Sequence, residues 1–340
     1  MKKIDFEAHF YTEDYLRALT ENRGYPRMKT DRKIGGYRLW YFPEVGQPFP
    51  EELMGKLLDI GEMRLRIMDE CGIDKQVLSL SAPGIEQLEP QIGMALARKT
   101  NDALAEVLKV YPSRFMGFAT LNPKDPEGAA DELERAVTEL GFVGWNTHSN
   151  YGDSYLDDEK YRPILERAER LDVPIYLHPT IPAIDQLRAY GLSLAGPAFG
   201  FGFETAMCML RLILAGVFDR YPGLTFILGH FGEALPFLLK RIDWGYRKSF
   251  DPGVKPSLEK MPSEYLKRNV FVTTSGRFSE AAFMCTREEM GIDRILLGTD
   301  YPYEDTVESI QFIEDLPVSG EEKADIYCEN ARKSGLVNIG

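Results

Sequence analysis

The stretch "KIDFEAHF", residues 3–10, is the first predicted strand, and in it Glu7 and His9 stand two apart and alternate with the apolar residues Phe6, Ala8 and Phe10. Side chains at alternate positions of a strand point to the same side of a sheet, so we expect these two to share one face. We expect Phe6 and Ala8 on the other face. Two polar side chains on the inner face of a strand predict a functional site at this point of the fold.

Seven further strand-like runs follow, with helical stretches between them. The predicted strands are 3–10, 76–82, 115–121, 142–148, 174–179, 225–230, 270–275 and 294–300. The clearest predicted helices are 90–110, 126–140, 157–172, 204–220 and 304–315, each with apolar residues near a 3.6-residue period. Strands that alternate with helices in this way predict an α/β fold, a (β/α)₈ TIM barrel with parallel strands inside and helices outside.

Two connections are too long to be plain turns. Residues 22–52 contain "KIGGYRLWYFPEVGQPFP" and residues 180–203 contain "AGPAFGFGF", and both leave the C-terminal end of a predicted strand. Long segments in a compact domain are usually functional covers or interfaces. We therefore expect one domain over residues 1–340, with these two inserted loops at the C-terminal face acting as interface and lid.

Composition narrows the class of protein. The 340 residues are 44% hydrophobic and 27% charged, and 53 acidic against 40 basic residues give a formal charge of −13. That charge argues against a nucleic-acid surface. No apolar run approaches the ~18 residues of a membrane span, and "MKKIDFEAHF" lacks the apolar stretch of a secretory signal. We expect a cytoplasmic protein that binds neither nucleic acid nor membrane.

The histidines carry the main chemical signal. The chain has four histidines, all at or near predicted strand ends: His9, His148, His178 and His230. The C-terminal ends of barrel strands meet at one rim, so these rings converge there, together with Glu7 and Asp300. Carboxylates with imidazoles suit a divalent ion such as Zn²⁺ or Mn²⁺.

Two alternatives to a metal remain open at this point. A histidine at a strand end is often only a hydrogen-bonded structural residue. Glu7 could form a salt bridge with an arginine. Burying Glu7 without any partner would cost several kcal/mol, and a bound cation would remove that cost.

The motifs resemble a known family. "FEAHF", "YLHP", "ILGHFGEALPF" and "LLGTDYPYE" resemble the amidohydrolase-type metal-dependent decarboxylases, which include γ-resorcylate, 2,3-dihydroxybenzoate and 5-carboxyvanillate decarboxylases. The similarity runs over nearly the whole chain. The E-x-H start is similar to the phenolic acid decarboxylases, whereas related hydrolases begin with H-x-H. "THSNYGDSYLDD" looks most like the 5-carboxyvanillate branch, and the histidine of "EAH" looks more like the γ-resorcylate branch.

The resemblance implies a role for each motif residue. The implied ligands of one divalent ion per chain, Mn²⁺ or Zn²⁺, are Glu7, His9, His178 and Asp300. The implied catalytic residues are Asp300, His230 and Glu233, with Glu233 orienting the His230 ring. The implied substrate-binding residues are Arg64, Arg241 and His148. As an alternative, Glu233 could be a carboxylate that only favours a helix N-terminus.

The implied activity is the reversible, non-oxidative decarboxylation of a small ortho-hydroxylated aromatic acid. We expect Asp300 to protonate the ring carbon that bears the carboxylate, and Arg241 to reach the site of a neighbouring chain in a homodimer or homotetramer. In the alternative interpretation, Arg241 is an ordinary surface arginine that pairs with Asp243 or a nearby carboxylate. A metal-dependent hydrolase of an amide, ester or lactone and a non-catalytic metal-binding protein are the alternative functions.

Overall fold

The computed structural model describes residues 1–249, 257–276 and 278–337. Within them, eight strands form one sheet in the order β1-β5-β6-β7-β8-β9-β10-β11, as predicted. The strands are β1 Ile4–Phe10, β5 Lys75–Leu80, β6 Phe115–Thr120, β7 Gly144–His148, β8 Ile175–His178, β9 Phe226–Leu228, β10 Val270–Thr273 and β11 Ile295–Leu296. Every pairing in this sheet is parallel.

The sheet closes on itself between its first and last strands. The Phe6 amide donates to the Leu297 carbonyl at 2.9 Å, and the His9 amide donates to the Tyr301 carbonyl at 2.7 Å. These bonds complete a (β/α)₈ barrel. β11 itself is only two residues long, but the chain that follows it runs beside β1 as far as Tyr301.

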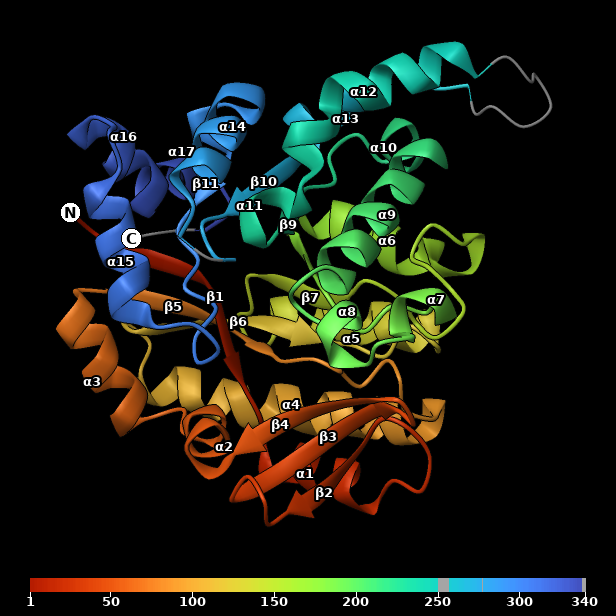
Figure 1. Cartoon of the computed structure of the whole chain (residues 1–340), viewed down its shortest axis with the longest axis vertical. Coiled ribbons are helices and arrows are strands. Elements are labelled where there is room, and N and C mark those ends of the chain that lie inside the picture. Colours follow the sequence, from red (N-terminus) through yellow and green to blue (C-terminus); the bar gives the residue numbers. More distant parts are fainter. Residues whose placement is uncertain (250–256, 277, 338–340) are drawn as a thin grey trace.

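Helices surround the barrel (Figure 1). The α-helices that precede β8 are α1 Glu13–Glu21, α2 Glu51–Leu58, α3 Glu62–Cys71, α4 Pro90–Val110, α5 Pro126–Thr138 and α6 Arg162–Leu171. Those that follow β8 are α7 Asp185–Arg188, α8 Leu192–Ala195, α9 Gly200–Leu214, α10 Val217–Arg220, α11 His230–Glu233, α12 Leu235–Lys248, α13 Pro262–Asn269, α14 Glu280–Met290, α15 Thr306–Asp315, α16 Gly320–Ala324 and α17 Asn330–Lys333. All five predicted helices are present, although the one predicted over 204–220 begins at Gly200 and breaks at Gly216, which has a φ of 72°.

A β-bulge in the first strand changes which side chains face the barrel. The register with β5 shifts between Asp5 and Ala8, so two residues of β1 lie opposite one residue of β5. The Asp5 carboxylate accepts the Glu7 amide at 3.1 Å and so replaces a lost ladder bond. Phe6 and Glu7 consequently both face inward, and the expectation that Phe6 shares the outer face with Ala8 is wrong.

The barrel interior is divided into an apolar half and a polar half. Its apolar half is a compact buried cluster made of inward-facing strand residues, among them Ile4, Phe6, Val77, Phe118, Tyr176, Ile227, Phe271 and Leu296. A larger cluster packs the outer faces of the strands against the helices. Nearer the C-terminal ends of the strands the inward positions turn polar, with Ser79, Thr273 and Asp300 among them. The apolar half is therefore the floor on which the polar site is built.

Residues 22–52 are not the loop that the sequence suggested. They contain a three-stranded antiparallel sheet, β2 Arg27–Asp31, β3 Gly36–Phe42 and β4 Val45–Pro50, which lies at one edge of the molecule beside α1 and α2 (Figure 1). The reason is the alternation in "GYRLWYF", where Leu39 and Tyr41 are buried and their neighbours are more exposed. The many Gly and Pro residues hid this pattern, because some lie at strand ends, such as Gly36, and others, such as Gly46 and Pro48, lie inside β4.

Residues 180–203 hold the short helices α7 and α8 and the first turn of α9. Among the described residues, no helix has both the length and the apolarity needed to cross a bilayer.

Truncating the barrel floor should destabilise the fold. Ile227→Ala removes a fully buried side chain of the interior cluster, and we expect it to lower stability by about 2–5 kcal/mol, since the closed barrel cannot collapse around the cavity. Ile92→Ala, at a position 55% exposed on α4, is the matched control. Thermal unfolding followed by circular dichroism measures both, and equal melting temperatures for the two variants would contradict the assigned interior.

Candidate active site

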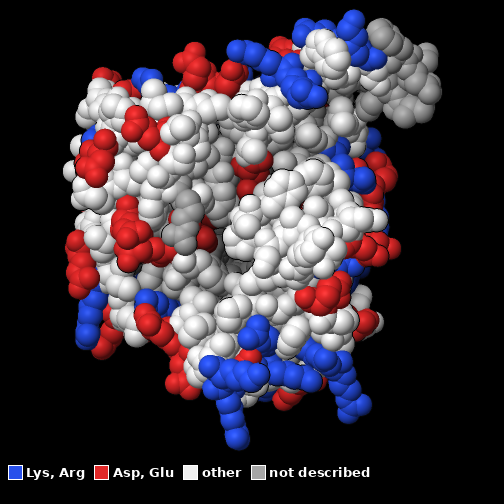
Figure 2. Space-filling view, viewed as in Figure 1, with Lys and Arg blue, Asp and Glu red and all other residues white. Residues whose placement is uncertain are grey.

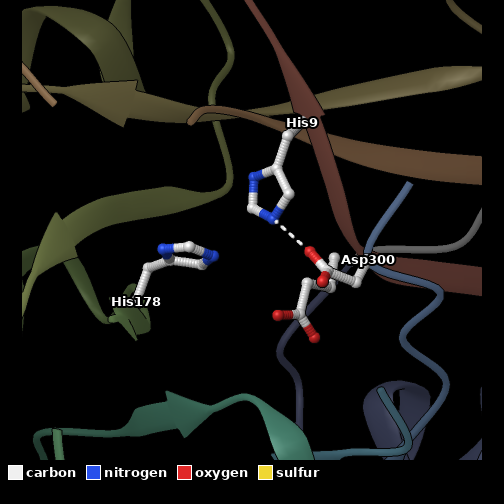
Figure 3. Close-up of side chains that lie close together, drawn as sticks. His9, His178 and Asp300 are labelled. Carbon is white, nitrogen blue, oxygen red and sulfur yellow. Dashed lines mark ion pairs between the residues drawn. The ribbon is translucent and has the colours of Figure 1, made fainter. Parts of the chain in front are cut away.

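Four polar side chains from distant parts of the chain converge at the C-terminal mouth of the barrel. One ligand atom from each of Glu7, His9, His178 and Asp300 lies within 4.8 Å of the others. Figure 3 shows His9 and His178 directed toward the same space as the Asp300 carboxylate. The side chains of Glu7 and His9 are fully buried, and that of Asp300 is 14% exposed. The arrangement brings together all four predicted metal ligands.

In each histidine of this group, Nδ1 lies within hydrogen-bond distance of a protein oxygen, and Nε2 points toward the shared space. The Nδ1 of His9 lies 3.0 Å from the Ser79 hydroxyl, which leaves Nε2 facing Asp300 Oδ1 at 3.1 Å. The Nδ1 of His178 lies 2.9 Å from the Pro179 carbonyl, so it donates there and its Nε2 faces the centre. Such outer hydrogen bonds fix the tautomer of a metal-binding histidine. Burial, helped by the nearby His9 and His148, holds the pKa of His178 well below its ordinary value, which favours the neutral ring that binds metals.

The Glu7 carboxylate is satisfied on one side only. Its Oε2 accepts hydrogen bonds from Thr273 at 2.6 Å and from Ser275. Its Oε1 has no hydrogen-bond partner among the described residues, and the same holds for His9 Nε2. No arginine of the described chain contacts Glu7, so the predicted alternative of a salt bridge is not what the structure contains.

These residues fit a divalent cation. Two buried polar atoms without hydrogen-bond partners, Glu7 Oε1 and His9 Nε2, belong to the same group of converging ligands. A buried carboxylate oxygen left unpaired is costly, and a cation would remove that cost. Two carboxylates and two imidazoles are also a ligand set that suits Mn²⁺ or Zn²⁺.

A second pair stands beside this group. The Nδ1 of His230 lies 2.7 Å from Glu233 Oε1, and its Nε2 lies 3.5 Å from Glu7 Oε1 and 4.0 Å from Asp300 Oδ2. Burial would lower the pKa of His230, but the charges of Glu233 and Glu7 outweigh it and hold this pKa well above its ordinary value. Glu233 therefore orients a ring that faces the metal ligands, which is more than a carboxylate at a helix N-terminus would do.

The backbone around these residues is strained. His230, Glu233 and Asp300 all have positive φ, between 52° and 54°, as do Phe231 and Ala234. Residues other than glycine seldom adopt this backbone conformation, and each residue that does so costs of order 1–3 kcal/mol. Residues with a strained backbone cluster at functional sites, where the orientation of a side chain matters more than local stability.

Asp300 connects the buried group to open space. Burial would raise the pKa of its carboxyl, but the neighbouring His230 and His9 rings outweigh this and hold the pKa below its ordinary value. With His230 and Glu233, Asp300 lines a cavity of about 520 Å³. Figure 2 shows a hollow on this face that is bordered mainly by uncharged residues, with acidic atoms at its edge.

Three predicted substrate-binding residues are not brought to this cavity. Arg64 is fully buried, and it donates to the carbonyls of His9 at 2.6 Å and Asp59 at 3.2 Å. Because its donors are used inside the protein, Arg64 supports the strand that carries the ligands. His148 is buried beside His178, with ring centres 5.5 Å apart.

Arg241 is an exposed residue of α12 and does not line the cavity. Among the described residues, no ion pair joins Arg241 to Asp243, whose carboxylate instead accepts hydrogen bonds from Ser263 at 2.7 and 3.0 Å.

Sequence reasoning missed the residues that hold the ligands. Ser79, Thr273 and Ser275 orient His9 and Glu7, and Glu86 lies 3.0 Å from His148 Nδ1. A signal was present for the first three, since "VLSLS" and "VFVTTS" end in polar residues at alternate positions, as "FEAHF" does. Glu86 carries no such signal because it lies in a loop.

The chain matches known proteins over nearly its whole length. The family model described as amidohydrolase matches residues 4–334. A γ-resorcylate decarboxylase of Polaromonas sp. (strain JS666) is 38% identical, over 99% of both chains. Among solved structures, 5-carboxyvanillate decarboxylase from Sphingomonas paucimobilis has a TM-score of 0.88 at 33% identity, over 99% of both chains.

A dihydroxybenzoic acid decarboxylase from Polaromonas sp. JS666 was solved with bound manganese and the inhibitor 2-nitroresorcinol. It has a TM-score of 0.85 at 36% identity and covers 100% of this chain and 98% of that one.

The purified protein should contain about one divalent ion per chain, because one converging group of ligands is found in the described part of the chain. Glu7→Gln removes an anionic ligand, and we expect it to weaken metal affinity at least about tenfold, since even outer-shell losses reach that scale. Mass spectrometry of metals after gel filtration measures the content. Glu288→Gln, at an exposed position of α14, is the control. Equal metal content in the Glu7 and Glu288 variants would contradict the assigned centre.

Proposed function

This chain belongs to the amidohydrolase family, and we propose that it is a metal-dependent carboxy-lyase that removes CO₂ reversibly, without oxidation, from a small ortho-hydroxylated aromatic acid. The observation that carries this proposal is the buried group Glu7, His9, His178 and Asp300, opening into a cavity of about 520 Å³. Its relatives named above are decarboxylases of hydroxybenzoate-type acids.

Glu7, His9, His178 and Asp300 hold one divalent ion, Mn²⁺ or Zn²⁺, in this proposal. When bound, the ion supplies a positive centre that orients an ortho-hydroxy carboxylate and stabilises the negative charge on its oxygens. The protein residues do the rest. Ser79, Thr273 and Ser275 keep His9 and Glu7 in place, so the site needs little rearrangement when the substrate enters.

Asp300 is the proposed proton donor, acting from its protonated form and taking up a new proton from water in the cavity after each turnover. Direct loss of CO₂ would leave an aryl carbanion whose electrons lie outside the π-system, so the ring carbon that bears the carboxylate is protonated first. Asp300 belongs to the group of metal ligands and also lines the cavity, which supports its role as the residue that reaches this carbon. The bond from ring to carboxylate then breaks, CO₂ leaves and its bonding electrons restore aromaticity. His230, aimed by Glu233, hydrogen-bonds a substrate oxygen or an exchanging water.

A hydrolase is the alternative function. It would use the same residues to activate a water for attack on an amide, ester or lactone. The E-x-H start of the first strand and the decarboxylases among the relatives favour the carboxy-lyase. Measurement of CO₂ release from 2,6-dihydroxybenzoate, 2,3-dihydroxybenzoate and 5-carboxyvanillate, beside an ester and lactone panel, separates the two functions.

A homodimer or homotetramer with shared sites is the proposed assembly of this cytoplasmic enzyme. Phe237, Arg241 and Trp244 are spaced by four and three residues on α12 and so lie on one face of that helix. Phe237 is 79% exposed and Trp244 is 58% exposed, which is unusual for large apolar side chains and suits an interface. On such a face Arg241 would reach the substrate of the neighbouring chain.

Asp300→Asn should lower turnover by about 10²-fold or more, the scale of general acid catalysis, while most of the metal is retained. The amide keeps a ligand oxygen but has no transferable acidic proton. Turnover is followed as CO₂ release and metal by mass spectrometry, with the exposed Asp315→Asn of α15 as control. Near-native turnover with Asn at position 300 would exclude this residue as the donor.

Mixing inactive chains tests the shared site. Arg241→Ala and Asp300→Asn chains are each expected to be poorly active, and their mixed dimer should regain activity, because one of its two sites would keep both residues. Native mass spectrometry confirms that mixed dimers form. If they form and activity does not return, Arg241 does not act across the interface.

A further inference from the structure

The walls of the active-site cavity differ in chemistry. One wall comes from residues 197–203 and α9 and is apolar, with Phe199, Phe201 and Phe203 among its side chains. Another wall is polar: Tyr41 and Gln47 of the three-stranded sheet belong to it with Ser81 and Tyr303. An aromatic ring bound in this cavity would have both carbon and hydrogen-bonding groups to contact.

The local geometry of the sheet positions Gln47. The register of β3 and β4 shifts between Trp40 and Phe42, so Tyr41 is the extra residue of a β-bulge. Bulges re-aim side chains and are frequent near active sites. The Tyr41 hydroxyl donates to Gln47 Oε1 at 3.0 Å. Because that oxygen is occupied, the amide of Gln47 presents its N–H groups as the remaining hydrogen-bonding function.

The polar wall is anchored to the barrel. Phe49 of β4 is fully buried, and its ring lies 6.4 Å from that of Tyr303. At the turn between β3 and β4, Arg188 donates to Glu44 at 3.0 Å and stacks over Phe42 at 4.0 Å. The sheet is thus held both by the barrel rim and by the second inserted segment, which keeps Gln47 in place before a ligand binds.

The charge of the cavity limits what this wall can bind. Of the described residues that line it, none is a lysine or arginine, whereas Glu233, Asp300 and Glu304 are acidic. Among the described residues, the lining therefore offers no lysine or arginine that could pair with a second carboxylate on the ring. Amide N–H groups and the hydroxyl pair of Ser81 and Tyr303, 2.7 Å apart, suit an uncharged hydroxyl.

We propose that Gln47 is a specificity-determining residue, which donates a hydrogen bond to a second, uncharged hydroxyl on the aromatic ring, and that Tyr41 is the positioning residue that aims it. The preferred substrate is then a dihydroxybenzoate rather than a monohydroxybenzoate or an aromatic dicarboxylate. This inference rests on the proposed function for the identity of the reacting carboxylate, and on the cavity alone for the second hydroxyl.

The kinetic test compares 2-hydroxybenzoate with 2,3- and 2,6-dihydroxybenzoate. We expect the wild-type enzyme to favour one dihydroxy acid in kcat/KM by at least about tenfold, since a site that hydrogen-bonds a hydroxyl rejects the analogue without it. Gln47→Leu should abolish most of this preference, because it should lower kcat/KM for the dihydroxy acid much more than for 2-hydroxybenzoate. Tyr41→Phe should act in the same direction but less strongly. If Gln47 had only a structural role, its substitution would lower kcat/KM for both kinds of substrate equally.

Tyr37→Phe, in the same strand but outside the cavity lining, is the control and should keep the wild-type preference. A wild-type preference for 5-carboxyvanillate, or an unchanged preference in Gln47→Leu, would overturn the proposal.

A binding experiment tests the role of Gln47 independently of the proposed decarboxylation. The metal-loaded enzyme is titrated calorimetrically with 2-nitroresorcinol and 2-nitrophenol, which differ by one hydroxyl. We expect tighter binding of 2-nitroresorcinol by wild type, and equal binding of the two by Gln47→Leu. If this holds while no acid loses CO₂, the specificity wall stands and the carboxy-lyase function fails. If CO₂ is released but Gln47→Leu still prefers 2-nitroresorcinol, the function stands and the role of Gln47 fails.

Discussion

The rest of the site depends on one constraint, the burial of the Glu7 carboxylate at the mouth of a closed barrel. A fully buried charge needs compensation, and the hydroxyls of Thr273 and Ser275 satisfy only one of its oxygens. The other oxygen faces the space shared with His9, His178 and Asp300. A divalent ion in that space compensates the charge of both carboxylates, and it explains why two imidazoles are held with their Nε2 atoms directed inward.

Much of this was readable from the sequence, for physical reasons. Parallel barrel strands end at one rim, so alternate polar residues at the ends of hydrophobic runs had to meet, and Glu7, His178 and Asp300 do meet. The alternation of polar and apolar residues could not predict the bulge in β1, because an inserted residue leaves no trace in composition. The bulge turns Phe6 toward the barrel interior, while Glu7 still faces inward as predicted.

Side-chain partners were less predictable than positions. Arg64 matched a motif, but burial commits its guanidinium to backbone carbonyls. The segment 22–52 read as a loop because Gly and Pro interrupt it, yet Leu39 and Phe49 find buried partners on the barrel rim and stabilise a sheet. Whether an aromatic-rich insertion forms a sheet depends on such long-range packing, which a local pattern does not contain. The consequence is functional, since this sheet forms the polar wall of the cavity.

Metal reconstitution tests whether the buried carboxylates and imidazoles form the metal centre of a carboxy-lyase. The enzyme is stripped with a chelator, dialysed, and titrated with Mn²⁺ while CO₂ release from 2,6-dihydroxybenzoate and bound metal are measured together. We expect activity to be absent without metal, to rise in proportion to bound Mn²⁺ and to reach its plateau at about one ion per chain. Full CO₂ release by the metal-free protein would contradict this expectation.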